Sequence, residues 1–221
     1  MASSKEKGSS PEPPKAVVIR LSLYLRELQH LVREGIETTS STQLGSRLGF
    51  SDAQVRKDLA YFGQFGRPGI GYPCAELIDT VRGILGADRS WPIALVGAGN
   101  LGRALLRYKG FSQRGFDIVA AFDTDPGKIG GKLEAVPIYS LEDLPAVARE
   151  KSIQLGIIAT PVGAAQQAAD QLVAAGVAGI LNFAPLAISL PDHVRTSEVD
   201  LAIELEQLSF AVVNSTIGKI K

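Results

Sequence analysis

Apolar residues follow two different spacings along this chain. Up to about residue 86 they recur every three to four positions, which is the spacing of amphipathic helices. From residue 91 onward, short continuous apolar runs alternate with stretches of helical spacing, as is typical of buried parallel strands joined by crossover helices. The pattern therefore predicts an N-terminal helical domain followed by an α/β domain with a doubly wound parallel sheet.

The helical part is expected to contain helices at residues 16–34, about 42–48, and 52–62. Ser41 is the expected cap of the second helix, and Ser51-Asp52-Ala53-Gln54 has the form of a capping box that opens the third. Two helices joined by a four-residue turn are typical of a helix-turn-helix unit. The first helix is indicated by apolar residues that recur at helical spacing, namely Val18, Leu21, Leu25, Leu28, Leu31 and Val32.

The third helix has one apolar face and one basic face. Its apolar side consists of Val55, Leu59 and Phe62. These side chains should pack in the core with Leu44, Leu48 and Phe50. The opposite face carries Ala53, Arg56, Lys57 and Ala60. In a major groove, arginine pairs with guanine and lysine meets phosphate. A recognition helix is one interpretation, and a solvated surface is the other.

Residues 63–72 contain four glycines and predict a tight hairpin after this helix. Such a loop is a wing when it carries a cation, and Arg67 at its tip is expected in a minor groove. A helix at 74–86 then closes the domain, and 87–90 is a linker. The lone Cys74 excludes an internal disulfide and a cysteine-based metal cluster, and we expect it to be buried.

A glycine-rich motif, Gly97-Ala98-Gly99-Asn100-Leu101-Gly102, separates a predicted strand at 91–96 from a predicted helix at 101–108. In such a unit the glycines allow a tight turn, close approach of a pyrophosphate, and close packing of the helix. A second strand at 117–122 delivers Asp123, 21 positions after Gly102, where an acid that binds the adenine ribose is expected. The motif predicts an NAD(H) site rather than an NADP(H) site; the alternative is a turn that serves packing alone.

The alternation continues with strands at 136–139, 154–159 and 179–183, and with helices at about 141–151 and 163–175. Ligands of such sheets lie beyond the carboxyl ends of the strands, so Thr160 and Pro161 either contact the cofactor or form an ordinary loop. The histidines His30 and His193 belong to no recognisable catalytic group. The fold is therefore expected to bind a cofactor without catalysis.

The last predicted helix, about 201–214, is apolar around much of its circumference. We expect it to be buried against a second subunit, with packing on its own domain as the alternative. The chain is 45% apolar and 21% charged, and residues 1–15 look like a polar tail, so a cytoplasmic protein is expected. Net charge is +2 over residues 1–90 and −2 over 91–221, too small an asymmetry to indicate nucleic acid by itself.

Five strings of this sequence form a recognisable set. They are Gln54-Val55-Arg56-Lys57-Asp58-Leu59-Ala60-Tyr61-Phe62-Gly63, Gly69-Ile70-Gly71-Tyr72, the glycine motif with Val96 before it, Tyr108-Lys109-Gly110-Phe111 and Leu181-Asn182-Phe183-Ala184-Pro185. Together they resemble the Rex family of redox-sensing transcriptional repressors. The resemblance covers nearly the whole chain after the tail. It implies a winged-helix domain (16–86), a Rossmann NAD(H)-binding domain (87–200), and a C-terminal helix (201–221) exchanged between the subunits of a homodimer.

The resemblance also implies that NAD⁺ permits binding to double-stranded operator DNA, an inverted repeat, and that NADH releases it. The expected DNA contacts are Ser51, Gln54, Arg56, Lys57, Tyr61 and Arg67, while Pro68 stands where the family often has a second basic residue. Tyr108 is expected near the nicotinamide, and Asp200 and Arg26 in a polar network that connects it with the DNA-binding domain. A plain helix cap is the alternative for Asp200, and an NAD-dependent oxidoreductase with an accessory helical domain is the alternative function.

Overall fold

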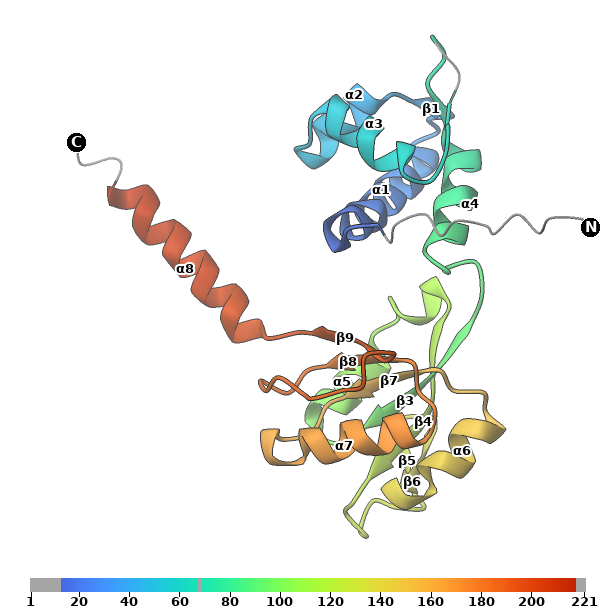
Figure 1. Cartoon of the computed structure of the whole chain (residues 1–221), viewed down its shortest axis with the longest axis vertical. Coiled ribbons are helices and arrows are strands. Elements are labelled where there is room, and N and C mark those ends of the chain that lie inside the picture. Colours follow the sequence, from blue (N-terminus) through green and yellow to red (C-terminus); the bar gives the residue numbers. More distant parts are fainter. Residues whose placement is uncertain (1–12, 67–68, 218–221) are drawn as a thin grey trace, which may run out of the picture. The chain divides into compact units, whose positions relative to one another are not determined.

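The computed structural model describes residues 13–66 and 69–217, and it divides into two compact units that separate after Arg89 (Figure 1). The expected tail falls mostly on residues 1–12, which lie outside the described residues, and the first helix already begins at Lys15. The boundary between the units lies within the stretch that the sequence predicts as a linker.

The first unit is built on helix α1 (Lys15–Arg33), which packs against α2 (Ser41–Leu48), α3 (Asp52–Ala60) and α4 (Cys74–Ile84). Its core includes Val55 and Leu59 of α3 and Leu44 of α2, with Leu48, Phe50 and Phe62 packed against them, as predicted. Cys74 is buried in the same core. The helix-turn-helix unit is thus present, and α3 ends two residues earlier than expected.

The apolar positions that indicate α1 are not all buried in it. Val18 and Val32 are exposed, whereas Val17 and Tyr24 are buried. Tyr24 can be fully buried because its hydroxyl group donates a hydrogen bond to the Asp58 carboxylate at 2.7 Å. The partner that satisfies this buried hydroxyl lies 34 positions away in the sequence, where the spacing of apolar residues along α1 does not reveal it.

The helix caps also differ from the prediction. Ser40, not Ser41, caps α2: its hydroxyl accepts from Gln43 N–H, and the Gln43 side chain accepts from Ser40 N–H, which completes a capping box. Ser41 is the first helical residue and is buried. At α3 only half of the expected box forms, since Ser51 accepts from Gln54 N–H while the Gln54 side chain bonds Asp58 instead.

The predicted hairpin at 63–72 does not form within the described residues. Strand β2 (Tyr72–Pro73) pairs antiparallel with β1 (Thr38–Thr39), which precedes α2, rather than with the chain before the loop. The described residues 61–66 and 69–71, between α3 and β2, form no strand. Arg67 and Pro68, expected at its tip, lie outside the described residues.

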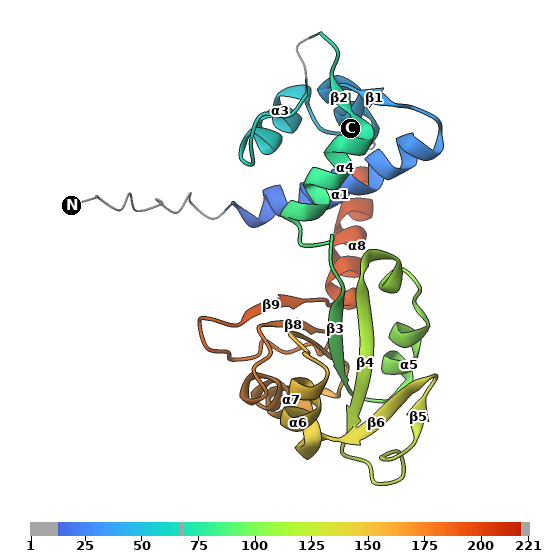
Figure 2. The same ribbon diagram turned by 90° about the vertical axis from the view of Figure 1, so that its right-hand side faces the viewer.

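In the described residues the second unit contains a seven-stranded sheet of order β5-β6-β4-β3-β7-β8-β9 (Figure 2). The strands are β3 (Trp91–Val96), β4 (Phe116–Asp123), β5 (Lys132–Leu133), β6 (Val136–Ser140), β7 (Leu155–Ile158), β8 (Gly179–Asn182) and β9 (Arg195–Glu198). All neighbours are parallel except β5, which is antiparallel to β6. The sequence predicts neither β5 nor β9, because one is two residues long and the other is exposed along its length.

Helices cover both faces of this sheet, as a doubly wound fold requires. Helix α5 (Asn100–Arg107) packs through Leu105 and Leu106 on one face, with Leu95 and Ile157. Helices α6 (Leu144–Glu150) and α7 (Val162–Ala174) cover the other face, together with Val96, Phe122 and Ile158. Short 3-10 turns precede β4 (η1, Ser112–Arg114) and α6 (η2, Leu141–Asp143).

Helix α8 (Leu201–Ile217) follows β9, and the described side chains from Leu201 to Asn214 are all exposed. Phe210 is 71% exposed and Leu205 is 66% exposed. Packing of this helix on its own domain, which the sequence left open, is therefore not what the chain adopts. In the described part of the chain, no helix is long and apolar enough to cross a membrane.

Candidate cofactor site and nucleic-acid interface

The glycine motif forms the turn between β3 and α5, at the carboxyl edge of the sheet. Gly97 has a φ of 106°, and a Cβ there would lie 2.5 Å from the carbonyl oxygen of Ala159. A Cβ on Gly102 would overlap the Gly97 carbonyl oxygen, so α5 packs directly on the turn. The space around Gly99 is open, and Asn100 and Leu101 beside it are exposed. The turn thus keeps the N-terminus of α5 free for an anion.

Asp123 ends β4, the strand next to β3, and its carboxylate meets the glycine turn. It accepts hydrogen bonds from Ala98 N–H at 2.9 Å, from Asp125 N–H at 3.0 Å and from the Lys128 ammonium at 3.0 Å. Burial opposes ionisation, but these three donors outweigh it, and the pKa of Asp123 lies below its ordinary value. An ionised acceptor therefore stands beside the turn, where a ribose hydroxyl can donate to it.

Thr160 follows β7 on the other side of β3, and its backbone nitrogen borders the space that a Gly97 side chain would fill. Among the described residues, its Oγ1 is the buried side-chain oxygen that has no hydrogen-bond partner. A buried hydroxyl is normally paired, so an unpaired one beside the turn points to a missing donor or acceptor. Pro161 caps the N-terminus of α7 and is exposed. These observations fit a bound dinucleotide.

Tyr108 does not lie at this edge. It follows the C-terminus of α5, where its exposed ring packs edge-on against Phe111 with centroids 5.0 Å apart. It borders an apolar groove of about 490 Å³ on the α5 face, lined also by Leu155 and Leu181. Because α5 spans roughly 12 Å, Tyr108 is separated by that length from the glycine turn of its own chain.

Asp200 follows β9 and is partly buried. Its carboxylate accepts hydrogen bonds from Ala202 N–H at 2.8 Å and Ile203 N–H at 3.4 Å, so it caps α8. In the described part of the chain no hydrogen bond joins Asp200 to Tyr108. Arg26 is exposed on α1, in the other unit. The capping role of Asp200 is therefore present, while the expected network of these three residues stays a prediction, since it joins residues of two separate units.

The exposed side of α3 is as predicted: Ala53, Arg56, Lys57 and Ala60 are all exposed. Ser51 and Tyr61, at the two ends of the helix, are exposed as well, and Gln54 is half-buried. On this face two alanines flank the two cations, and the opposite side of α3 packs on the core of the first unit. A helix of this kind can enter a major groove.

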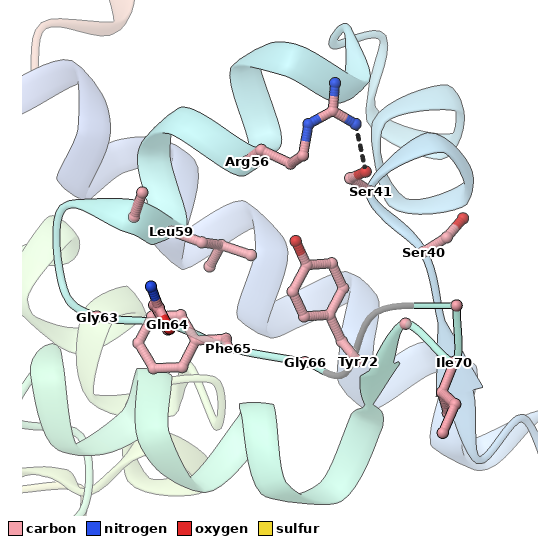
Figure 3. A pocket seen from close by; sticks show the side chains of 13 residues that line it. Ser40, Ser41, Arg56, Leu59, Gly63, Gln64, Phe65, Gly66, Ile70 and Tyr72 are labelled. Atoms are coloured by element: carbon pink, nitrogen blue, oxygen red, sulfur yellow. Dashed lines mark hydrogen bonds between the residues drawn. The ribbon is translucent and has the colours of Figure 1, made fainter.

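Arg56 has partners in the free chain. Its guanidinium donates to Asp52 at 2.7 Å and to Ser41 at 3.1 Å. It borders a pocket of about 720 Å³ between α3 and the loop of residues 63–66 and 69–71, and Figure 3 shows its side chain turned toward Ser41, with the Tyr72 ring nearby. Both bonds come from Nη1, so Nε and Nη2 of the guanidinium keep donors for a further partner.

Sequence reasoning missed two polar partners. Lys128, beside Asp123, carries no motif of its own, and its hydrogen bond with Asp123 raises the pKa of its ammonium group. Asp58 lies in the predicted recognition helix but is 1% exposed and binds the Arg20 guanidinium through both carboxylate oxygens. A polar residue on the core stripe of α3 was the available signal. The described residues contain no cluster of His, Cys, Asp and Glu able to hold a metal ion.

Two family models match the chain. Residues 13–60 match a putative DNA-binding protein N-terminus, and residues 88–186 match a CoA binding domain, a Rossmann-like fold. The first region contains α1, α2 and α3, and the second contains the glycine turn, Asp123 and Thr160. The models therefore fall on the two units separately.

Curated relatives extend over most of the chain. The redox-sensing transcriptional repressor Rex of Pelotomaculum thermopropionicum is 50% identical over 200 residues, which cover 90% of this chain and 94% of that relative. Rex of Carboxydothermus hydrogenoformans is 49% identical over 199 residues, which cover 90% of this chain and 96% of that relative.

Solved structures agree. The crystal structure of RSP in complex with β-NAD⁺ and operator DNA matches with a TM-score of 0.88 at 34% identity, over 94% of this chain and 96% of that one. The crystal structure of RSP in complex with β-NADH matches with a TM-score of 0.84 at 33% identity, over 95% of this chain and 99% of that one. RSP is a Rex-family repressor. With the same two units, in the same order and over nearly its whole length, this chain belongs to the Rex family of redox-sensing transcriptional repressors.

Proposed function

We propose that this protein binds operator DNA as a homodimer, is held there in the presence of NAD⁺, and is released by NADH. The observation that carries the proposal is that one chain joins an exposed basic helix α3 to a glycine turn with an unpaired buried hydroxyl at Thr160. A relative of 34% identity is solved with both β-NAD⁺ and operator DNA.

At the cofactor end, the N-terminus of α5 beside Gly99 receives the pyrophosphate, and the Asp123 carboxylate accepts from the adenine ribose. Thr160 and Pro161 border the same turn, and Gly97, Ala98, Asn100, Leu101 and Gly102 form it. The cofactor supplies a nicotinamide ring that is cationic when oxidised and neutral when reduced, and the protein's task is to respond to that difference. Hydride transfer is not part of the proposal.

At the DNA end, α3 enters the major groove with Arg56 on a base and Lys57 on phosphate. Ser51, Gln54 and Tyr61 flank them, and Arg67 acts from the wing. A single recognition helix covers only a half-site, so an inverted repeat needs two chains related by two-fold symmetry.

Two apolar surfaces support the homodimer. All described side chains of α8 are exposed, including Phe210, and the groove beside α5 presents Phe111 and Leu155 on one face of the sheet. Exposed apolar surface of this extent is typical of an interface. Exchange of α8 between the two chains buries it, as the resemblance implies, and places Tyr108 and Asp200 from different chains within one assembly.

The oxidoreductase alternative is not favoured, because the relatives are named transcriptional repressors. His193 precedes β9 and so stands at the amino edge of the sheet, opposite the glycine turn. The protein is proposed to act in the cytoplasm.

A gel-shift experiment with a short inverted-repeat duplex tests this function. We expect a complex in NAD⁺ that dissociates as NADH is added, and no complex with a scrambled duplex. Equal binding in the two cofactors would contradict redox sensing. Steady oxidation of NADH in the presence of the protein and an added carbonyl compound as hydride acceptor would favour the enzyme.

A further inference from the structure

Asp58 is a buried carboxylate on the side of α3 that faces α1. Its two oxygens accept four hydrogen bonds: from Arg20 Nε at 2.5 Å and Nη2 at 2.8 Å, from the Tyr24 hydroxyl at 2.7 Å, and from Gln54 Nε2 at 2.7 Å. Arg20 and Tyr24 belong to α1, whereas Gln54 lies one turn before Asp58 on α3. One carboxylate thus joins the supporting helix to the first turn of the recognition helix.

Stability alone does not account for a carboxylate at this position. Taking an ion pair out of water costs about as much as the pair returns, and well-packed apolar residues often replace such pairs without loss. The stripe of α3 on either side is apolar, with Val55 and Leu59 fully packed. A polar residue in that stripe therefore serves orientation rather than burial.

The orientation that it fixes is that of the Gln54 amide. An ionised carboxylate only accepts hydrogen bonds, so the amide must turn its NH₂ group, and not its oxygen, toward Asp58. One N–H is then occupied, while Oε1 and the second N–H remain for another partner. These are the two atoms with which glutamine recognises N6 and N7 of adenine in a major groove.

We propose that Asp58, held by Arg20, is a positioning residue that orients Gln54 to read an adenine in each operator half-site. This inference rests on the proposed function, since it requires α3 to enter the major groove. The two-point contact from Arg20 fixes the plane of the carboxylate, and the carboxylate fixes the amide. Specificity at one base pair thereby depends on residues of α1 that do not reach the DNA face of α3.

The test measures operator affinity in NAD⁺ for duplexes in which each base pair of the half-site is replaced in turn. The operator affinity of wild-type protein should fall roughly 5- to 150-fold when the adenine that Gln54 reads is replaced. Gln54→Ala should abolish that preference. Asp58→Asn should reduce it strongly, because an amide at position 58 can donate or accept and no longer selects one orientation. The double variant should match Gln54→Ala, as expected when two residues act through one contact.

Tyr24→Phe is the matched control, because it removes a donor to the same carboxylate without touching Gln54. It should lower the thermal midpoint and keep the base preference. If Asp58→Asn does not fold, Arg20→Lys carries the same test, since it keeps the charge and loses the two-point contact. A uniform loss of affinity for all duplexes in Asp58→Asn or Arg20→Lys would overturn the inference. Failure of the proposed function is distinguishable, because wild-type protein would then bind no operator at all.

Discussion

The carboxylate of Asp123 accepts a hydrogen bond from the backbone N–H of Ala98 at 2.9 Å, across 25 positions of sequence. The acid expected to bind the adenine ribose therefore also holds the glycine turn that is proposed to receive the pyrophosphate. Lys128 contacts the same carboxylate at 3.0 Å and keeps it ionised. A ribose that donates to Asp123 joins a preformed set of contacts, which reduces the ordering that binding requires.

Replacing Asp123 tests this arrangement. Asp123→Ala should weaken NADH binding by roughly 10- to 150-fold, because a hydrogen bond to a charged group contributes about 1.5–3 kcal/mol. It should also reduce discrimination against NADPH, since the carboxylate that repels a 2′-phosphate is gone. Calorimetry with both cofactors measures these effects. Asp125→Ala, which removes a neighbouring carboxylate that does not contact Ala98, is the control, and equal wild-type affinity for NADH and NADPH would contradict the prediction.

Stability in acid should depend on Asp58 and Asp123. Burial disfavours both carboxylates, but their hydrogen bonds outweigh it, and the pKa of each lies below its ordinary value. A group with a lowered pKa stabilises the fold above its unfolded pKa of about 3.9 and loses that contribution as pH falls through the lower folded pKa. The thermal midpoint should therefore fall below about pH 4.

Melting curves between pH 3 and 7 measure this fall. Asp58→Asn should be less stable than wild type at neutral pH, and the difference should shrink in acid. Asp79→Asn, at an exposed site on α4, should follow the wild-type curve. A difference that is constant over the whole range would show that Asp58 contributes nothing through its charge.

Arg56 and Lys57 should affect DNA binding in different ways. Arg56→Ala should cost about 1–3 kcal/mol of operator binding and relax specificity at one base pair. Lys57→Ala should weaken binding to all sequences alike and reduce the salt slope by about 1. Asp52→Asn, which removes the carboxylate paired with Arg56 and a negative charge beside the DNA-facing side of α3, should tighten binding. Unchanged operator affinity in all three variants would indicate that this side of α3 is an ordinary solvated surface and does not contact DNA.

Helix α8 should govern the oligomeric state. Deleting residues 201–221 should give monomers or insoluble protein, and Phe210→Asp should shift the dimer toward monomer, because each removes or charges an apolar surface that requires cover. Light scattering after size exclusion measures the mass. Thr80→Asp, at an exposed position on α4, should stay dimeric. A well-behaved monomer that binds the operator after the deletion would rule out the exchanged helix.

Asp200 distinguishes a switch from a cap. A ligand shifts an equilibrium only by its difference in affinity between two states, and NAD⁺ and NADH differ in the charge of one ring. If the Asp200 carboxylate responds to that charge, Asp200→Asn should retain the cap, bind NADH, and lose the dependence of operator affinity on cofactor, because asparagine caps as well but is neutral. Gel shifts in each cofactor measure the ratio. A wild-type ratio in Asp200→Asn would leave Asp200 as a plain cap, and Asp200→Ala would then affect only stability.

The sequence alone predicted what depends on local spacing. The turn at Gly97 and the acid at Asp123 follow from adjacent strands and helices, and the exposed Arg56–Lys57 face follows from helical periodicity. The fold class follows in the same way, since alternating apolar runs are a local signal. These predictions did not need to know which distant residues meet.

Only the tertiary structure decided the contacts between distant segments. Burial of Tyr24 depends on Asp58, the pairing of β1 with β2 replaces the predicted hairpin, and Thr160 lies beside Gly97 because β7 neighbours β3. An edge strand such as β9 has no apolar pattern to detect, since neither of its faces is buried. Each of these contacts forms only once the whole chain has folded. The free energy that favours them comes from packing and from hydrogen bonds between distant residues, which the local spacing of apolar residues does not reveal.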